Sequence, residues 1–161
     1  VFEFSSGDLT NYWLSSSMNI ASVECKSGKY KKIKCNLFES YDCQLIEPKP
    51  ILHANSPSIS DNKYSSKNFK GYIFDKYVKS IDKFGNETLD IIVVNPPLLL
   101  GCIIHAIPKV RKGGVIVITG IDYSDYIDQI LEYLNGWEKK IIRGVACEPP
   151  YLKESIVFKK V

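Results

Sequence analysis

The sequence predicts an α/β fold, a three-layer doubly wound domain with a seven-stranded, mostly parallel sheet whose last strand is antiparallel. Three observations support this. Short apolar runs alternate with amphipathic segments along the chain. Residues 89–94 and 115–119 are almost continuously apolar, as expected for parallel strands covered on both faces. Two strand-like segments close the sequence without a helix between them, which predicts an antiparallel pair. The length of 161 residues fits a single domain over 1–161.

The expected strands are short runs rich in β-branched and aromatic residues, bounded by Gly, Pro, Ser or Asn. In chain order they are residues 1–4, 20–24, 43–47, 89–94, 115–119, 141–147 and 155–161. The expected helices carry apolar residues at three- and four-residue steps. They are residues 10–18, 28–35, 69–81, 98–110 and 126–134. The longest loop, residues 48–66, is rich in Pro, Ser and Asn, and it is the best candidate for a segment that faces a substrate.

Composition argues against several function classes. The 21 basic and 18 acidic residues give a formal charge of +3, which argues against a nucleic-acid partner because a dedicated binder shows a basic stripe. The most apolar stretch, residues 91–107, is interrupted by Asn95, two prolines and a histidine, so no membrane span is expected. Five cysteines in odd number, without a C-x-x-C pair, indicate reduced thiols in a cytoplasmic protein, and no metal-ligand spacing is present.

Ligands of open α/β sheets bind at the carboxyl ends of the strands. The turn after the first strand contains Ser5, Ser6 and Gly7, and Gly7 permits close approach of a ligand to the backbone. Glu24 ends the second strand 17 residues after Gly7, where an acidic side chain can accept hydrogen bonds from the ribose hydroxyls of an adenosine ligand. The turn is not G-x-G-x-x-G, so a dinucleotide site is poorly supported. An ordinary turn and a solvated glutamate are the alternative.

Taken together, several segments resemble the class I S-adenosylmethionine-dependent methyltransferases, in particular a subgroup that opens E-F-G-S-G-x-S-T and continues S-V-E. The matching segments are residues 1–10, 22–24, 45–48, 77–81, 89–94 and 108–116. They follow the family's order and cover nearly the whole chain. The resemblance implies a Rossmann-like fold, S-adenosylmethionine as cofactor and methyl transfer as the activity.

The resemblance also implies roles for single residues near the first two strands. Glu3 corresponds to the acidic residue that helps hold the methionine amino end of the cofactor. Ser5, Ser6 and Gly7 correspond to the turn beneath its methionine and ribose. Glu24 corresponds to the acid that binds the ribose hydroxyls.

Two further residues follow later strands. Glu47, after the third strand, is a weaker match to a residue near the adenine. Asn95, after the fourth, corresponds to the position beside the sulfonium and is the expected catalytic residue, facing the methyl acceptor. An in-line displacement at an activated carbon works mainly by positioning, so a nucleophile or metal is not needed.

The sequence departs from the family at two sites. Ser5 stands where the family has its first glycine, and its Cβ can crowd the cofactor. The family's Asp-Gly after the fourth strand is replaced by Asn95-Pro96-Pro97, which resembles the motif of enzymes that methylate planar nitrogens. Leu98 follows in place of the stacking aromatic residue, so a small-molecule acceptor, such as a sugar or metabolite, is preferred. A catalytically inactive interaction or scaffold module is the alternative.

The family also has helices before its first strand, whereas this sequence begins at that strand. We therefore expect the missing wall of the acceptor pocket to come from a partner or from a longer chain. Exposure of Tyr12 and Trp13 would then favour a homodimer.

Overall fold

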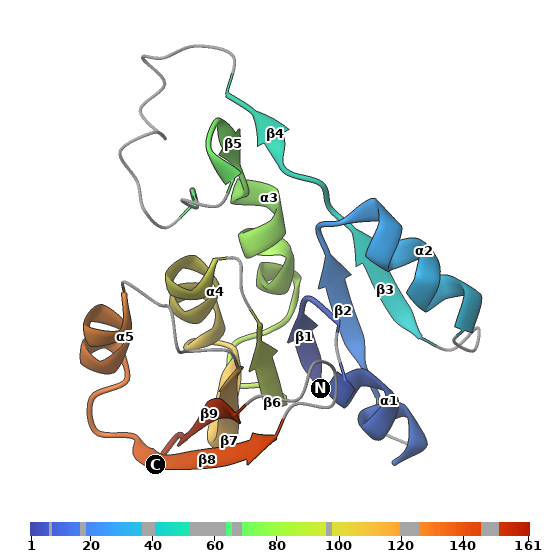
Figure 1. The fold of residues 1–161 in the computed structure, drawn as a ribbon. Helices are drawn as coiled ribbons and strands as arrows, with labels where there is room; N and C mark the ends of the chain where they lie inside the picture. The colour runs from blue at the N-terminus through green and yellow to red at the C-terminus, as the bar shows by residue number, and fades with distance from the viewer. Residues whose placement is uncertain are drawn as a thin grey trace.

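The predicted fold class is confirmed by a computed structural model, which describes residues 1–6, 8–16, 19–36, 41–51, 64–65, 69–95, 98–119, 126–145 and 152–161. Its main sheet has seven strands in the order β3-β2-β1-β6-β7-β9-β8 (Figure 1). β9 pairs antiparallel with both of its neighbours, so it alone runs against the other six. The strands are β1 Phe2–Phe4, β2 Ala21–Glu24, β3 Asp42–Leu45, β6 Leu89–Val94, β7 Val110–Thr119, β8 Glu138–Val145 and β9 Leu152–Lys159.

Helices cover both faces of this sheet. One layer holds α1 and α2, and the other holds α3, α4 and α5, as Figure 1 shows. The helices are α1 Asp8–Ser15, α2 Ser27–Asn36, α3 Asp75–Val78 with its 3-10 extension η3 Lys79–Lys83, α4 Leu99–Ala106 and α5 Ile127–Tyr133. In the part of the chain that the structure describes, no helix is long and apolar enough to cross a membrane.

The alternation of side chains along β1 separates two differently packed faces. Phe2 and Phe4 join the large apolar cluster beneath α3, α4 and α5, which also contains Ile92 and Ile103. Glu3 lies between them in sequence and therefore points to the opposite face, where Thr10 of α1 contacts it. A smaller apolar cluster on the α1–α2 side packs Ile20, Tyr41 and Cys43 against partly buried residues that include Trp13, Leu14, Tyr30 and Ile33.

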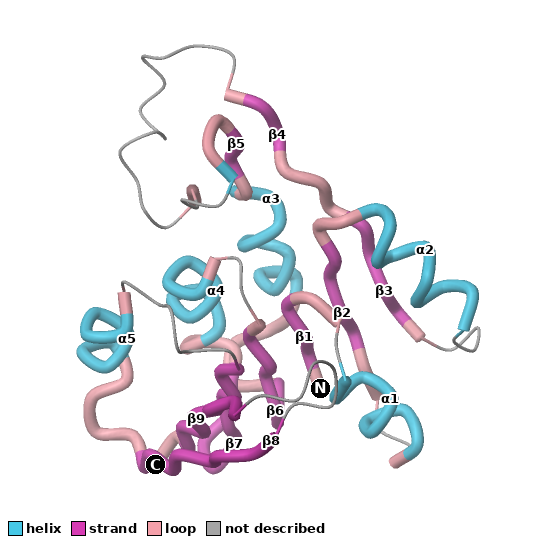
Figure 2. The backbone as a smooth tube through the Cα atoms, viewed as in Figure 1, coloured by secondary structure: helices cyan, strands magenta, loops and turns pink. Residues whose placement is uncertain are grey.

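The helix predicted over residues 69–81 is only partly correct. Tyr72–Ile73 form a short strand, β5, which pairs antiparallel with β4, Lys49–Pro50, apart from the main sheet (Figure 2). Gly71 has φ +82° and turns the chain into this strand, so the helix starts only at Asp75. Tyr72, whose spacing suggested a buried helical position, is 43% exposed.

The boundary between α4 and β7 also differs from the prediction. The helix ends at Ala106, and Val110 already pairs with Leu89 of β6. The register then shifts, so that Ile91 pairs with Val115. A Cβ on Gly114 would lie 2.8 Å from the Asp90 carbonyl oxygen, so this irregular crossing requires a glycine.

Of the two residues expected at a dimer contact, Tyr12 and Trp13, only Tyr12 is largely exposed. Trp13 is partly buried and packs within its own chain, against the cluster on the α1–α2 side. Tyr12 is 57% exposed, with its ring edge-on to that of Trp13 at 5.0 Å between centroids. The homodimer stays a prediction.

Candidate functional site

The candidate site lies at the carboxyl edge of the sheet, where β1, β2 and β6 end side by side. The backbone N–H of Ser5 donates to the Val23 carbonyl at 2.8 Å, and that of Asn95 donates to the Phe4 carbonyl at 3.2 Å. These two bonds hold the residue after β1 against β2 and the residue after β6 against β1. The predicted positions Ser5, Glu24 and Asn95 are thus brought to one edge.

Glu24 is the most strongly held group of this edge. Its side chain has no solvent exposure. Oε1 accepts the backbone N–H of Cys25 at 2.9 Å and that of Lys26 at 3.3 Å. Oε2 accepts the Ser5 hydroxyl at 3.2 Å and lies 3.4 Å from the ammonium of Lys29. A buried charge needs such partners, and here they come from the turn after β1 and from the start of α2.

Ser5 occupies the turn in a conformation that favours glycine. Its φ is +65°, in the left-handed region, where a Cβ costs about 1–2 kcal/mol. The side chain is buried, and its hydroxyl links two charged groups, because it accepts from Lys29 Nζ at 3.1 Å and donates to Glu24. Serine in place of the family's glycine at position 5 therefore places a hydroxyl against Glu24, the residue predicted to bind the ribose.

Glu3 is buried on the α1 side of the sheet and does not reach the Glu24 cluster through any hydrogen bond in the described ranges. The Thr10 hydroxyl donates to its Oε2 at 2.8 Å. Burial raises the pKa of the Glu3 carboxyl to about 7, against the opposing effects of Thr10, Trp13 and more distant Lys29. The carboxyl therefore changes protonation near neutral pH.

Ser6 joins a buried hydroxyl cluster instead of the Glu24 group. The Tyr41 hydroxyl shares a hydrogen bond of 2.6 Å with Ser22 Oγ and one of 3.2 Å with Ser6 Oγ. Burial raises the pKa of Tyr41 to about 12, so its proton stays available for these bonds. The cluster ties the turn after β1 to β2 and to the residue that precedes β3.

The remaining predicted residues have fewer contacts than Glu24 in the part of the chain that the structure describes. Asn95 is half-buried at the end of β6. Glu47 lies two residues beyond β3 with its side chain exposed, and no hydrogen bond or ion pair of the described residues joins it to Glu24. Gly7 and the prolines at 96 and 97 lie outside the described residues. Leu98 is buried in the large apolar cluster, so it is a core residue.

Sequence reasoning missed three side chains that hold the site. Lys29 lies in a run of lysines that is typical of a solvated helix face, yet its side chain turns back to the tip of β2. Thr10 and Tyr41 fasten Glu3 and Ser6, respectively. A signal existed for Thr10, because it lies seven residues after Glu3 on the helix that follows the strand. Nothing in the sequence around Lys29 or Tyr41 distinguishes them from surface residues.

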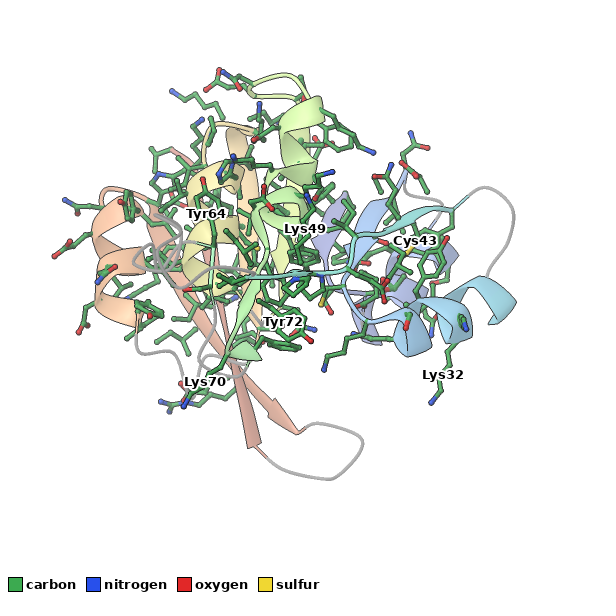
Figure 3. The ribbon with its side chains drawn as sticks, turned by 90° about the horizontal axis from the view of Figure 1, so that it is seen from above. Lys32, Cys43, Lys49, Tyr64, Lys70 and Tyr72 are labelled. Atoms are coloured by element: carbon green, nitrogen blue, oxygen red, sulfur yellow. The ribbon has the colours of Figure 1, made fainter. Side chains whose placement is uncertain are left out.

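The segment that carries the separate β4–β5 pair lies beside this edge. The β4–β5 pair, which carries Lys49 and Tyr72, crosses between the two helix layers when the molecule is seen from above (Figure 3). The Lys26 ammonium lies 5.8 Å from the centre of the Phe69 ring. This contact connects the residues just before β5 with the residues just after β2. Tyr64 anchors the same segment, because its carbonyl accepts the Phe74 N–H and its hydroxyl contacts His105 at 3.3 Å.

The described residues do not group three His, Cys, Asp or Glu side chains in a way that could hold a metal ion. Cys25, Cys43 and Cys102 are free thiols and buried, and burial raises the pKa of Cys25, beside Glu24, to about 11. A thiol held protonated in this way is a poor nucleophile. The polar chemistry described at the edge therefore comes from the carboxylate, the hydroxyls and Lys29.

Comparison with known proteins gives no matching family model and no matching curated protein. Solved structures do match. The O-methyltransferase TomG of Streptomyces achromogenes, solved with S-adenosylmethionine, is 14% identical with a TM-score of 0.62, over 99% of this chain and 72% of its own. A methyltransferase of Archaeoglobus fulgidus that depends on the same cofactor is 13% identical with a TM-score of 0.60, over 99% and 85%.

An rRNA methylase of Streptococcus thermophilus is similar to the same degree, with 12% identity and a TM-score of 0.60 over 99% of this chain and 86% of its own. At this level of sequence identity, the structural likeness shows that the helices and strands are arranged in the same way. It does not identify the methyl acceptor. The strand order, the single antiparallel strand and these likenesses together show that the chain has the fold of the class I S-adenosylmethionine-dependent methyltransferases.

Proposed function

We propose that this protein binds S-adenosylmethionine at the carboxyl edge of β1 and β2 and transfers its methyl group to a small-molecule acceptor. The observation that carries the proposal is the buried Glu24 carboxylate at the tip of β2, next to the Ser5 turn. Two backbone N–H groups fix one of its oxygens, which leaves the other facing the turn. A carboxylate oriented in this way suits the two hydroxyls of a ribose.

The donor set fits the cofactor in chemical type. Glu24 would hold the ribose, and the Ser5–Ser6 turn would lie beneath the methionine part. Glu3 would act on the ammonium end from the α1 side, and a cation there would favour its ionised form. When bound, the cofactor supplies a methyl group already activated by its sulfonium. The chain itself has to orient the two reactants and exclude water, and a base is needed only for a hydroxyl acceptor.

Asn95 is our candidate for the acceptor side. Its backbone N–H is bonded to Phe4, so the residue is fixed at the end of β6 while its amide stays half-buried. Such an amide can donate to and accept from a polar acceptor group. The small formal charge of +3 supports a metabolite-sized acceptor over a polyanion. A planar nitrogen is the narrower version of this proposal, and the burial of Leu98 removes the neighbouring residue as a stacking partner.

Isothermal titration with S-adenosylmethionine and S-adenosylhomocysteine tests the proposal. We expect binding to the wild type, and a loss of about tenfold or more in affinity for Glu24→Gln, since one or two hydrogen bonds to a charged acceptor are weakened. Glu132→Gln is the matched control, because Glu132 is exposed on α5 in the other helix layer. Failure of the wild type to bind either ligand at millimolar concentration would reject the proposal.

A second candidate, a methyltransferase-like module without activity, is favoured by one observation. Ser5 and Lys29 already occupy the oxygen of Glu24 that a ribose would use. In this case the cluster would be a purely structural tie between β1, β2 and α2. The titration separates the two candidates directly, because a structural tie predicts no binding by the wild type.

A further inference from the structure

We infer that Lys29 competes with the ribose of the cofactor for Glu24, so that a ligand enters this site only by expelling the Lys29 ammonium. The inference rests on the proposed function, because it concerns the same carboxylate. It assigns to Lys29 the role of an affinity-setting residue, although it lies on the first turn of α2 in a run of lysines.

The argument begins with the hydrogen-bonding capacity of Glu24. An ionised carboxylate offers about four acceptor sites. Two are taken at Oε1 by the N–H groups of Cys25 and Lys26 and one at Oε2 by the Ser5 hydroxyl, and the Lys29 ammonium lies 3.4 Å from Oε2 as an ion pair. Three hydrogen bonds and the ion pair therefore surround the carboxylate, which has no solvent exposure. A ribose with two hydroxyl donors can bond to it only if donors already present leave.

Lys29 is the donor that can leave. The two N–H groups belong to the backbone at the β2–α2 junction, and Ser5 is held in the turn by its own backbone bond to Val23. The Lys29 side chain is 38% exposed and ends a flexible four-carbon stem, so its ammonium can move into water. Its departure also frees the Ser5 hydroxyl, which at present accepts from Lys29 and can rotate.

The consequence for binding has a definite sign. In the free protein, Lys29 neutralises a buried charge, and that interaction is lost when a neutral diol takes its place. Replacing Lys29 with a neutral residue removes this competition, so the ligand no longer displaces an ion pair. For a pair with one partly exposed member the gain is modest, about fivefold in Kd.

Calorimetry on four proteins tests the inference. The ligands are S-adenosylhomocysteine and its 2′,3′-dideoxy analogue, which lacks both ribose hydroxyls. The proteins are the wild type, Lys29→Met, Lys29→Gln as a second variant should the first not fold, and Lys32→Met. Lys32 is the matched control, because it is exposed on the same helix and points away from the sheet (Figure 3).

We expect S-adenosylhomocysteine to bind about fivefold more tightly to the Lys29 variants than to the wild type and the Lys32 variant. The dideoxy analogue should show no such gain, since it does not engage Glu24. Thermal unfolding without ligand should show a lower Tm for Lys29→Met than for Lys32→Met, because Glu24 loses its counter-ion.

Three results would overturn the inference. If the wild type binds and the Lys29 variants bind equally or more weakly, Lys29 is no competitor and the proposed function still stands. If the gain is as large for the dideoxy analogue, Lys29 controls access and does not compete with the ribose. If no protein of the set binds either ligand at millimolar concentration, the proposed function itself fails and the inference fails with it.

Discussion

On the face of the sheet covered by α3, α4 and α5, β1 contributes Phe2 and Phe4 to a continuous apolar cluster. On the face covered by α1, the same strand contributes Glu3, and the neighbouring strand contributes Ser22. The first face stabilises the fold by removing apolar area from water, and the second buries polar groups that must be hydrogen-bonded to be tolerated. The comparison indicates that the larger apolar cluster stabilises one face, whereas the other face combines a smaller apolar cluster with buried polar groups near the strand ends.

The largest expected effect comes from breaking the apolar face. Ile103→Ala removes a side chain of α4 that is completely buried, and we expect a loss of about 3 kcal/mol in the free energy of unfolding. Ile142→Ala, at a position 48% exposed on β8, should cost less than about 1 kcal/mol. Urea unfolding followed by circular dichroism measures both. Equal losses would show that burial beneath α4 is not what stabilises this face.

The buried Glu3 carboxyl of the polar face should make the free energy of unfolding depend on pH. Because the pKa of Glu3 is raised from 4.5 to about 7, the folded state binds more protons than the unfolded state between these values. Its contribution to stability is therefore fully present below pH 4.5 and is lost as the pH rises to 7. Between pH 5 and pH 8 we expect the wild type to lose about 2 kcal/mol more than Glu3→Gln, which does not titrate.

Urea unfolding of both proteins at the two pH values gives this difference, and the other titrating groups cancel because the proteins share them. Glu132→Gln should behave as the wild type, since Glu132 is exposed. Parallel pH dependences for wild type and Glu3→Gln would mean that the carboxyl is already ionised at pH 5. The two faces would then differ less than the packing suggests.

A smaller effect is expected where the polar face carries backbone strain, at Ser5. Ser5→Gly and Ser5→Ala both lose the hydroxyl that bonds to Glu24, but only glycine adopts φ +65° without a Cβ penalty. We expect Ser5→Gly to be more stable than Ser5→Ala by about 1 kcal/mol. Comparing the two Tm values tests this. Equal stability would indicate that the turn relaxes to a negative φ in the alanine variant.

The same contrast explains how far the sequence could be interpreted. The buried strand at residues 89–94 was recognisable because continuous apolar runs fit few other structures. The meeting of Ser5 and Glu24 followed from the rule that parallel strands end at one edge. Residues 69–81 were misassigned because the spacing of Tyr72 and Tyr77 also fits a short strand followed by a short helix. The pairing that decides it, Lys49 with Ile73, joins residues far apart in sequence.

Lys29 could not be recognised for a different reason. The lysine run in residues 29–34 resembles a solvated helix face, and only a tertiary contact singles out the one that folds back on Glu24. The conformation of the flexible Lys29 side chain depends on the groups that it contacts at the tip of β2, Glu24 and Ser5. That information lies in the three-dimensional arrangement of three segments and is absent from the helix itself.

The position of β9 has a consequence for synthesis. This strand lies between β7 and β8, so β8 has no neighbour in the main sheet until residues 152–159 are present. A chain emerging from the ribosome can pair β1, β2, β3, β6 and β7 as they appear, but it must hold β8 unpaired until β9 has followed. Nascent chains halted before residue 152 should therefore expose the edge of β7 to proteases and chaperones, and release of β9 would end that exposure.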